Sequence, residues 1–224
     1  MAVACAVLLS GCDDKDSDYH SFGLTSSISD EGIVVVYSDQ PGDVLTVQST
    51  DSWKANTGCD WLVFTEGGTP AAERHIDYAY GSAETAMLPL TFKANNTGAL
   101  RAAVVKFTAN GREAGIQYVQ LYFMNVTDPA PSYTDATRFA GATFTKEIGA
   151  GATSATVAFT LHSDASLASD QGWLTLSETS FAAGEHEVTL TLGPNTTGAD
   201  RYANLTLLSA TGAKTLITVK QGDR

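Results

Sequence analysis

The residues best suited to recognising a ligand lie between positions 65 and 87. They are acidic, basic and aromatic in close succession, with one more aromatic residue from an earlier segment: Glu73, Arg74, His75, Tyr78, Tyr80 and Trp53. Tyr78 and Tyr80 are two positions apart, so in an extended strand they project from the same face. Aromatic side chains pack on the apolar faces of sugar rings, while carboxylates and guanidinium groups bond to hydroxyls. The chemistry that this segment indicates is non-covalent binding of a carbohydrate.

The residue pattern does not favour catalysis. A glycosidase needs two carboxylates at a defined separation in a cleft, whereas the acidic residues here are scattered over turns. The four His residues show no metal-ligand spacing such as His-Glu-x-x-His, and no Gly-x-Ser-x-Gly nucleophile motif occurs. We therefore expect no enzyme activity, no cofactor and no metal site.

Cys12 lies where the sequence predicts a covalent modification. The apolar run of residues 1–9 is too short to cross a bilayer as a helix. It ends in Leu9-Ser10-Gly11-Cys12, which resembles a bacterial lipobox, although no Lys or Arg precedes the run. The resemblance implies removal of residues 1–11 as a signal peptide and acylation of Cys12, which would give a membrane anchor of several acyl chains.

The acidic run after Cys12 bears on location. Residues 13–18 are rich in Asp and resemble the surface-export signal of Bacteroidota lipoproteins. That resemblance implies a surface-exposed lipoprotein of the outer membrane, in the cell envelope. In enterobacteria an Asp directly after the lipidated Cys instead indicates retention in the inner membrane, so the location depends on lineage. Residues 12–27 are polar and aperiodic, and we expect them to form a flexible tether.

The charge balance excludes one class of partner. The chain of 224 residues has a formal net charge of −12, with 25 Asp and Glu against 13 Lys and Arg. Nucleic-acid binding requires clustered Lys and Arg to neutralise phosphates, and the sequence contains no such cluster. We expect no nucleic-acid partner.

A short motif occurs twice, at residues 95–101 and 195–201. Each copy follows a Trp-Leu pair and precedes a strand that ends in Gln. The repeated residues are Trp61, Asn95, Gly98, Arg101 and Gln120 in the first copy, and Trp173, Asn195, Gly198, Arg201 and Gln221 in the second. We expect the Gly residues to adopt positive φ, the Asn residues to cap a turn, and the Arg residues to bind loop carbonyls or a carboxylate. The Trp residues should fill the space between two sheets. Two copies predict two domains of one type.

The two copies differ in length at one place. From Trp to turn Asn the first copy takes 34 residues (61 to 95) and the second takes 22 (173 to 195). The surplus of twelve lies within residues 65–87, which also carry the candidate binding residues. An insertion that the scaffold does not need is a candidate site. The alternative is a surface hairpin that only extends a sheet.

The remaining pattern predicts an all-β protein. Apolar and polar residues alternate in short segments separated by Gly, Asn and Pro turns, and no segment has a long helical period. We predict two tandem β-sandwiches of about seven strands each, at residues 28–126 and 138–224. Residues 127–137 contain two prolines and are predicted to form a stiff linker.

The repeated features together resemble a known family. A Ser-x-x-Ser-Trp segment at residues 49–53, the Trp-Leu pairs, the Asn-x-x-Gly-x-x-Arg turns and the final Gln resemble the BACON domain, a Bacteroidetes-associated, often N-terminal module. The resemblance covers residues 30–123 and 140–222. It implies an immunoglobulin-like fold and binding of polysaccharide or mucin glycans, although some members look like spacers. It carries no binding residue over to this chain.

Two functional hypotheses follow for this non-enzymatic, lipid-anchored surface protein. In the first, the segment of residues 65–87 binds glycan. In the second, the chain is a spacer or an assembly component that contacts other envelope proteins through strand edges or domain faces.

Overall fold

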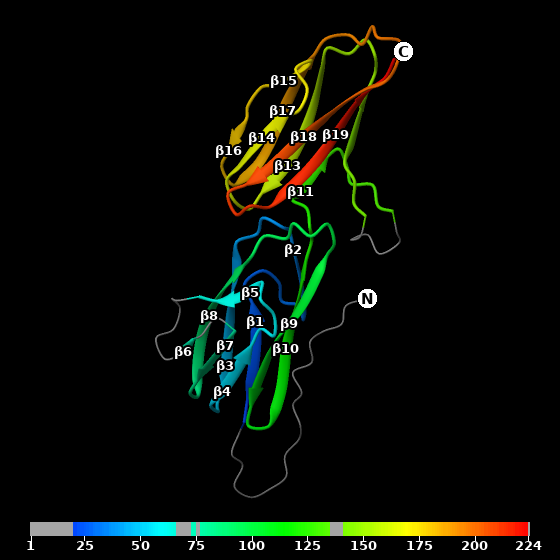
Figure 1. Cartoon of the computed structure of the whole chain (residues 1–224). Helices are drawn as coiled ribbons and strands as arrows, with labels where there is room; N and C mark the ends of the chain where they lie inside the picture. Colours follow the sequence, from blue (N-terminus) through cyan, green and yellow to red (C-terminus); the bar gives the residue numbers. More distant parts are fainter. Residues whose placement is uncertain (1–19, 66–72, 75–76, 135–140, 224) are drawn as a thin grey trace, which may run out of the picture. The chain divides into compact units, whose positions relative to one another are not determined.

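The computed structural model describes residues 20–65, 73–74, 77–134 and 141–223 (Figure 1). All regular elements in these residues are β-strands, arranged as four sheets. The chain forms two compact units. The first comprises residues up to 36, 42–93 and 102–119, and the second comprises 37–41, 94–101 and 120 onward. The prediction of an all-β protein with two β-sandwiches is confirmed.

The first unit packs a four-stranded sheet, in the order β1-β3-β8-β5, against a six-stranded sheet, in the order β2-β10-β9-β4-β7-β6. The strands are β1 (Phe22–Ser26), β2 (Ile33–Val36), β3 (Gly42–Ser49), β4 (Trp53–Asn56), β5 (Leu62–Phe64), β6 (Glu73–Arg74), β7 (Tyr78–Gly81), β8 (Glu84–Phe92), β9 (Arg101–Ala109) and β10 (Arg112–Gln120). Alternate residues of each strand face the space between the sheets, because successive side chains of a strand point to opposite faces.

The core of the first unit is aliphatic and aromatic. Trp61 is 5% exposed within it, as the sequence predicted, and Leu45, Leu88 and Phe107 are fully buried. Burial of each such side chain contributes about 1.5–3 kcal/mol. This core holds β4, β7 and β9 side by side and therefore determines which residues share the outer face of the six-stranded sheet.

The second unit repeats the plan with a four-stranded sheet, β11-β13-β17-β15, and a five-stranded sheet, β12-β19-β18-β14-β16. Its strands are β11 (Asn125–Asp128), β12 (Thr145–Ile148), β13 (Ser154–Leu161), β14 (Ala165–Ser169), β15 (Leu174–Leu176), β16 (Ser180–Phe181), β17 (Gly184–Leu192), β18 (Arg201–Ser209) and β19 (Lys214–Gln221). β12 pairs with β19 in parallel, and β13–β17, β15–β17, β14–β18 and β18–β19 are antiparallel pairs.

The expected tether is shorter than residues 12–27. Phe22–Ser26 form β1, which pairs antiparallel with Leu45–Ser49 of β3. Phe22 and Leu24 pack against the first core. Burial of these two alternating apolar side chains places the segment as an edge strand. The polar residues around them made the alternation too short to recognise in the sequence. Residues 1–19, and with them the predicted signal peptide and Cys12, lie outside the described residues.

The expected boundary between the sandwiches was also wrong. Leu121, Phe123, Met124 and Val126 are buried in the second core, and β11 pairs with β13. The second unit therefore begins at about residue 120, and the Pro-containing segment predicted as a linker follows a strand of this unit. The two prolines signalled a turn correctly, but a turn inside a domain has the same local chemistry as one between domains.

The described residues include no helix with the length and apolar character needed to cross a bilayer.

Candidate functional site

The repeated Asn is the centre of a turn in both copies. The Nδ2 of Asn195 donates to the carbonyl oxygens of Ala199 (2.8 Å) and Gln221 (3.2 Å), and its Oδ1 accepts from the backbone N of Thr197 (3.1 Å). Asn95 makes the equivalent bonds at 2.9, 3.2 and 3.2 Å. Both side chains are buried, so these bonds satisfy groups that could not reach water. The motif serves turn structure, as predicted.

The repeated Arg binds the repeated Gln. Arg101 Nε donates to Gln120 Oε1 at 2.8 Å, and Arg201 Nε donates to Gln221 Oε1 at 2.8 Å. The Arg201 guanidinium also lies 4.1 Å from the centre of the Trp173 ring, a cation–π contact. Trp173 is only partly buried beside the core, so the expectation that it fills the space between the sheets was wrong. A partly exposed ring suits a residue that stacks on a cation.

The surplus segment of the first copy forms the end of the six-stranded sheet. β7 pairs with β4 and β6 pairs with β7, both antiparallel. The insertion is therefore a hairpin that extends the sheet, which is the structural alternative that the sequence left open. It also adds a new surface, because β7 presents the alternating sequence Tyr78-Ala79-Tyr80.

Tyr78 and Tyr80 lie on the outer face of this hairpin. They are 40% and 37% exposed, while Ala79 between them is fully buried. Their rings are nearly parallel, with an interplanar angle of 11° and centroids 6.4 Å apart. The sequence predicted that the two rings would share a face, and this is confirmed. Partly exposed Tyr rings offer an amphipathic surface of the kind that packs on the apolar face of a sugar ring.

A groove runs across the outer face beside these two rings. Tyr78, Asn56 and Lys106 are register neighbours on β7, β4 and β9, and Tyr80, Lys54 and Thr108 form the next row. A hollow of about 1100 Å³ is lined by all six residues, and an adjoining hollow of about 550 Å³ shares Lys54, Tyr80 and Thr108 with it. We call these six residues the tyrosine groove. The larger hollow alone exceeds the range of about 300–1,000 Å³ typical of ligand sites.

Four members of the tyrosine groove were missed in the sequence. Lys54 and Asn56 come from β4, and Lys106 and Thr108 come from β9. Their alternation with buried Trp53, Ala55, Val105 and Phe107 was a usable signal that they face outward. The signal could not show that β4 and β9 lie next to β7, because strand order depends on long-range pairing.

The expectation that Trp53 presents a ring to a sugar is contradicted by its burial. Trp53 is 2% exposed, and its ring packs 6.1 Å from that of Phe107. Gly81 also lies against the indole, and a Cβ there would approach it to 2.5 Å. Trp53 lines the floor of the smaller hollow but offers no aromatic face, and we leave it out of the tyrosine groove.

The other expected binding residues are only partly described. The backbone of Glu73 pairs with that of Tyr80, and the backbone of Arg74 pairs with that of Ala79, so both lie next to β7. His75 lies outside the described residues. Glu73 and Arg74 therefore form the strand next to β7. That their side chains supply polar contacts to a ligand stays a prediction.

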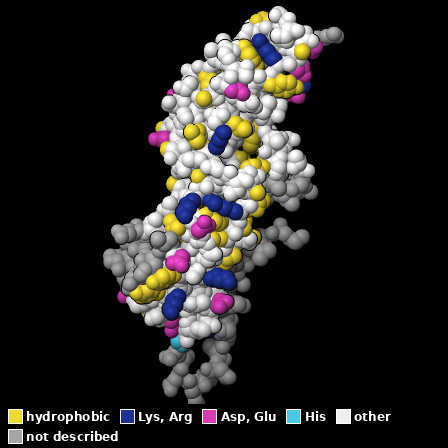
Figure 2. Space-filling model, in the orientation of Figure 1, with side chains coloured by type: hydrophobic (Ala, Val, Ile, Leu, Met, Phe, Trp, Pro, Cys, Tyr) yellow, Lys and Arg dark blue, Asp and Glu magenta, His cyan; other side chains and the backbone are white. Residues whose placement is uncertain are grey.

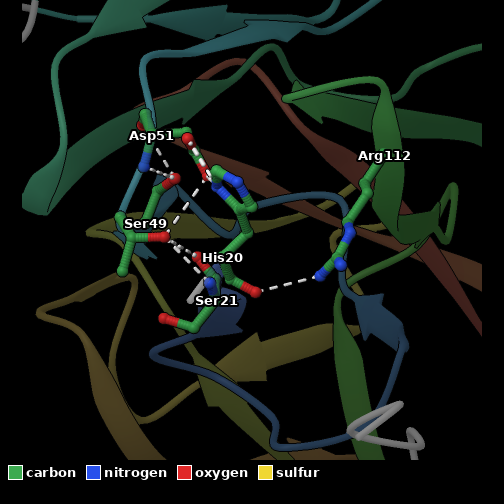
Figure 3. Close-up of polar contacts among 6 residues, drawn as sticks. His20, Ser21, Ser49, Asp51 and Arg112 are labelled. Atoms are coloured by element: carbon green, nitrogen blue, oxygen red, sulfur yellow. Dashed lines mark hydrogen bonds and ion pairs between the residues drawn. The ribbon is translucent and has the colours of Figure 1, made fainter. Parts of the chain in front are cut away.

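A polar cluster at the start of the described chain has a structural role (Figure 3). His20 Nδ1 lies 2.8 Å from Asp51 Oδ2, and Arg112 donates to the His20 carbonyl oxygen at 3.0 Å. Ser21 N donates to Thr50 Oγ1 at 2.8 Å. These bonds connect the residues before β1 to the β3–β4 turn and to β10. Within the described residues, no group of three His, Cys, Asp or Glu could hold a metal ion.

A second polar cluster is buried between the sheets of the first unit. Asp43 accepts from Ser26 Oγ at 2.5 Å, from Ser27 N at 3.0 Å and from the Tyr118 hydroxyl. Burial raises the pKa of Tyr118, and its hydrogen bond to Asp43 raises it further. A carboxylate inside an apolar core is tolerated only when it is fully hydrogen-bonded. This cluster joins β1, β3 and β10 and does not reach the tyrosine groove.

The fold and the groove define a tandem β-sandwich protein with a groove on one outer sheet face. Comparison with known proteins narrows this class. Residues 163–222 match the BACON family model, described as "Putative binding domain, N-terminal". The second unit thus contains a BACON domain. No curated protein matches the chain.

Solved structures resemble the chain at low sequence identity. A Bacteroides ovatus GH5 xyloglucanase in complex with a XXXG heptasaccharide is 23% identical over 35% of this chain, which is 17% of that chain, with a TM-score of 0.33. The D0-D1 domain of intimin is 12% identical and covers 89% of this chain and 94% of that one, with a TM-score of 0.29. Titin Ig tandem domains are 9% identical, with coverage of 92% and 98% and a TM-score of 0.27.

Proposed function

We propose that this protein is a non-catalytic interaction protein that binds glycan in the tyrosine groove. The observation that carries the proposal is the parallel Tyr78–Tyr80 pair on an outer sheet face, beside a hollow of about 1100 Å³. Asn56, Thr108 and the two Lys residues place amide, hydroxyl and ammonium groups around the rings. Apolar ring faces surrounded by a few polar groups are typical of small-molecule and saccharide sites. The match of residues 163–222 to a binding-domain family supports an interaction role.

The repeated turn supports extending the family to the first unit. The Asn bonds and the Arg Nε–Gln Oε1 bond agree between the copies to within about 0.1 Å. We infer that the first unit is a second BACON-like sandwich, modified by the β6–β7 hairpin. In this view the family scaffold is common to both units and the groove belongs to the first.

The glycan-binding proposal is tested by affinity electrophoresis of the full chain in gels that contain a panel of neutral and anionic polysaccharides and mucin. We expect at least one of these to retard the protein. Tyr78→Ala and Tyr80→Ala should each weaken that affinity about tenfold, which corresponds to about 1.4 kcal/mol. Tyr202→Ala is the control, because Tyr202 is an exposed tyrosine of the second unit, 54% accessible. Migration unaffected by every glycan would contradict the proposal.

We also propose that an acylated Cys12 anchors the protein in a membrane. Leu9-Ser10-Gly11-Cys12 and the acidic residues that follow support acylation of Cys12 and display on the surface of an outer membrane. A diacylated and N-acylated cysteine carries enough buried CH₂ groups, at about 0.8 kcal/mol each, for stable anchoring. Metabolic labelling with a radioactive fatty acid should label the protein, and Cys12→Ala should abolish the label and release the chain from the membrane fraction. Label retained by Cys12→Ala would refute this anchor.

One observation favours the second hypothesis, an assembly component. β2 is an edge strand of the six-stranded sheet, and its residues Ile33 and Val35 are exposed. An edge strand with apolar side chains can pair with another chain. Concentration-dependent self-association that Ile33→Lys removes, together with no glycan binding, would support this function in place of the first.

A further inference from the structure

The charge of the tyrosine groove differs from that of the chain as a whole. The protein carries 25 Asp and Glu against 13 Lys and Arg. Among the described residues that line the two adjoining hollows, there is no Asp or Glu, and two are Lys. The described lining of these hollows is therefore more positive than the molecule as a whole, which has a net charge of −12.

The two Lys residues are placed by strand register. Lys54 pairs with Thr108, and Asn56 pairs with Lys106, so the Lys residues are diagonal neighbours on β4 and β9. Diagonal neighbours on one sheet face lie roughly 7–8 Å apart, within reach of long side chains. Tyr80 and Tyr78 occupy the same two rows on β7. One face thus presents an aromatic pair and, beside it, a pair of cations.

The two Lys residues of the groove form no ion pair within the described part of the chain. Lys146 is paired with Asp128 at 2.6 Å and Lys220 with Asp200 at 2.9 Å. Lys54 and Lys106 make no such pair with a described residue, and both are exposed. Their ammonium groups are available to a bound anion, whose hydrogen bonds with a cation are stronger than those between neutral groups.

The distribution of Lys and Arg on the surface of the first unit does not indicate a partner that is a polyanion recognised by charge alone. Figure 2 shows that Lys and Arg side chains on the visible face occur singly or in small groups, with Asp and Glu side chains interspersed among them. Salt at physiological concentration screens exposed charges beyond about 8 Å. A ligand in the groove therefore responds chiefly to the two Lys residues there, while nucleic acid requires a longer basic track.

We propose that the tyrosine groove selects anionic glycans, whose carboxylate or sulfate groups bind Lys54 and Lys106 while a sugar ring packs on Tyr78 and Tyr80. This inference rests on the proposed function, because it specifies which glycan the same groove takes. A neutral glycan would use the rings and the hydroxyl-binding groups but would leave two desolvated cations without a partner, which is unfavourable. The Lys pair therefore determines specificity and the Tyr pair supplies contact area.

The test compares polysaccharides that differ only in charge. The full chain is run in affinity gels with polygalacturonate and with its fully methylated ester, and with dextran sulfate and uncharged dextran. We expect retardation by at least one anionic member and at least tenfold weaker binding to its neutral partner. Raising the salt concentration from 50 to 500 mM should weaken the anionic interaction severalfold.

Substitutions test whether the charge-dependent binding occurs in the tyrosine groove. Lys54→Gln and Lys106→Gln should each weaken binding of the anionic polysaccharide about fivefold to tenfold and reduce its salt dependence. Lys214→Gln, which removes an exposed charge from the second unit, should leave both unchanged. Tyr78→Ala should weaken binding of charged and neutral forms alike.

The outcomes separate the two proposals. Tyrosine-dependent binding that is equal for charged and neutral forms, and insensitive to the Lys variants, would overturn the anionic inference and leave glycan binding standing. Loss of all glycan binding would overturn both. Stronger groove-dependent binding of single-stranded poly(dT) than of any glycan would also overturn both, because bases stack on aromatic rings as well.

Discussion

At the residue scale, the repeated motif consists of side chains whose chemistry is used entirely within the fold. Gly98 and Gly198 both have a φ of 76°, a conformation that a Cβ disfavours. Asn195 donates to backbone carbonyl oxygens, and Arg201 donates to the side chain of the buried Gln221. These contacts hold the repeated side chains in the turn, so their repetition indicates a shared scaffold.

Also at this scale, Tyr118 gives the first unit a pH-dependent stability. Its pKa is raised because the folded state buries the hydroxyl and hydrogen-bonds it to Asp43. The folded form therefore keeps the proton, while the unfolded form ionises near pH 10. The stabilisation is complete below about pH 10 and decreases as pH rises above it, by about 1 kcal/mol between pH 10 and pH 11 and by about 1.4 kcal/mol for the next pH unit.

Tyr118→Phe should remove this component of the pH dependence. It should also lower stability at pH 7 by about 1–3 kcal/mol, because Asp43 stays buried with one donor fewer. Urea unfolding followed by tryptophan fluorescence at pH 8 and pH 11 measures both effects. Tyr202→Phe, at an exposed position of the second unit, serves as the control. Identical pH dependence for wild type and Tyr118→Phe would show that Tyr118 ionises in the folded state.

At the element scale, the hairpin of β6 and β7 makes the two sandwiches different. The sheet that contains it has six strands, and the corresponding sheet of the second unit has five. In that sheet β16 pairs with β14 as β7 pairs with β4, so β6 is the added strand and β7 is the longer counterpart of β16. Because β7 pairs with β4, the hairpin places Tyr78 and Tyr80 beside side chains that the common scaffold already carried outward. A longer edge strand with one added strand beside it can thus create a binding face without altering the core.

β11 shows why the domain boundary matters experimentally. A chain of residues 120–224 keeps β11 and four buried side chains, Leu121, Phe123, Met124 and Val126, whereas a chain of residues 138–224 loses them. At about 1.5–3 kcal/mol each, their loss is comparable with the whole stability of a domain, about 5–15 kcal/mol. We expect the longer chain to unfold cooperatively on heating and the shorter one to be unfolded at 25 °C.

Circular dichroism and thermal melts of the two chains test this boundary. Both lack residues 37–41 and 94–101 of the second unit equally, so the comparison isolates the segment from 120 to 137. Equal melting midpoints would place the start of the second domain after the prolines, as the sequence alone suggested.

At the scale of the whole molecule, the chain combines an acidic surface, two related sandwiches and one groove with a local excess of positive charge. A net charge of −12 favours solubility and repels polyanions at long range. Selection of an anionic glycan would then require close contact in the groove, which raises specificity above what a generally basic surface provides.

The sequence by itself determined the features that depend on local period and local turn chemistry. Alternation predicted strands and the shared face of Tyr78 and Tyr80, and the repeated turns predicted two related sandwiches. The sequence-based prediction was wrong at β1, at β11 and at Trp53, because the local residue pattern at each of these is compatible with two different positions in the fold. Only the tertiary structure decided that β4 and β9 lie beside β7, and so that Lys54 and Lys106 meet the tyrosines. Strand order is set by burial of the whole core across long sequence separations, and a local pattern does not contain that information.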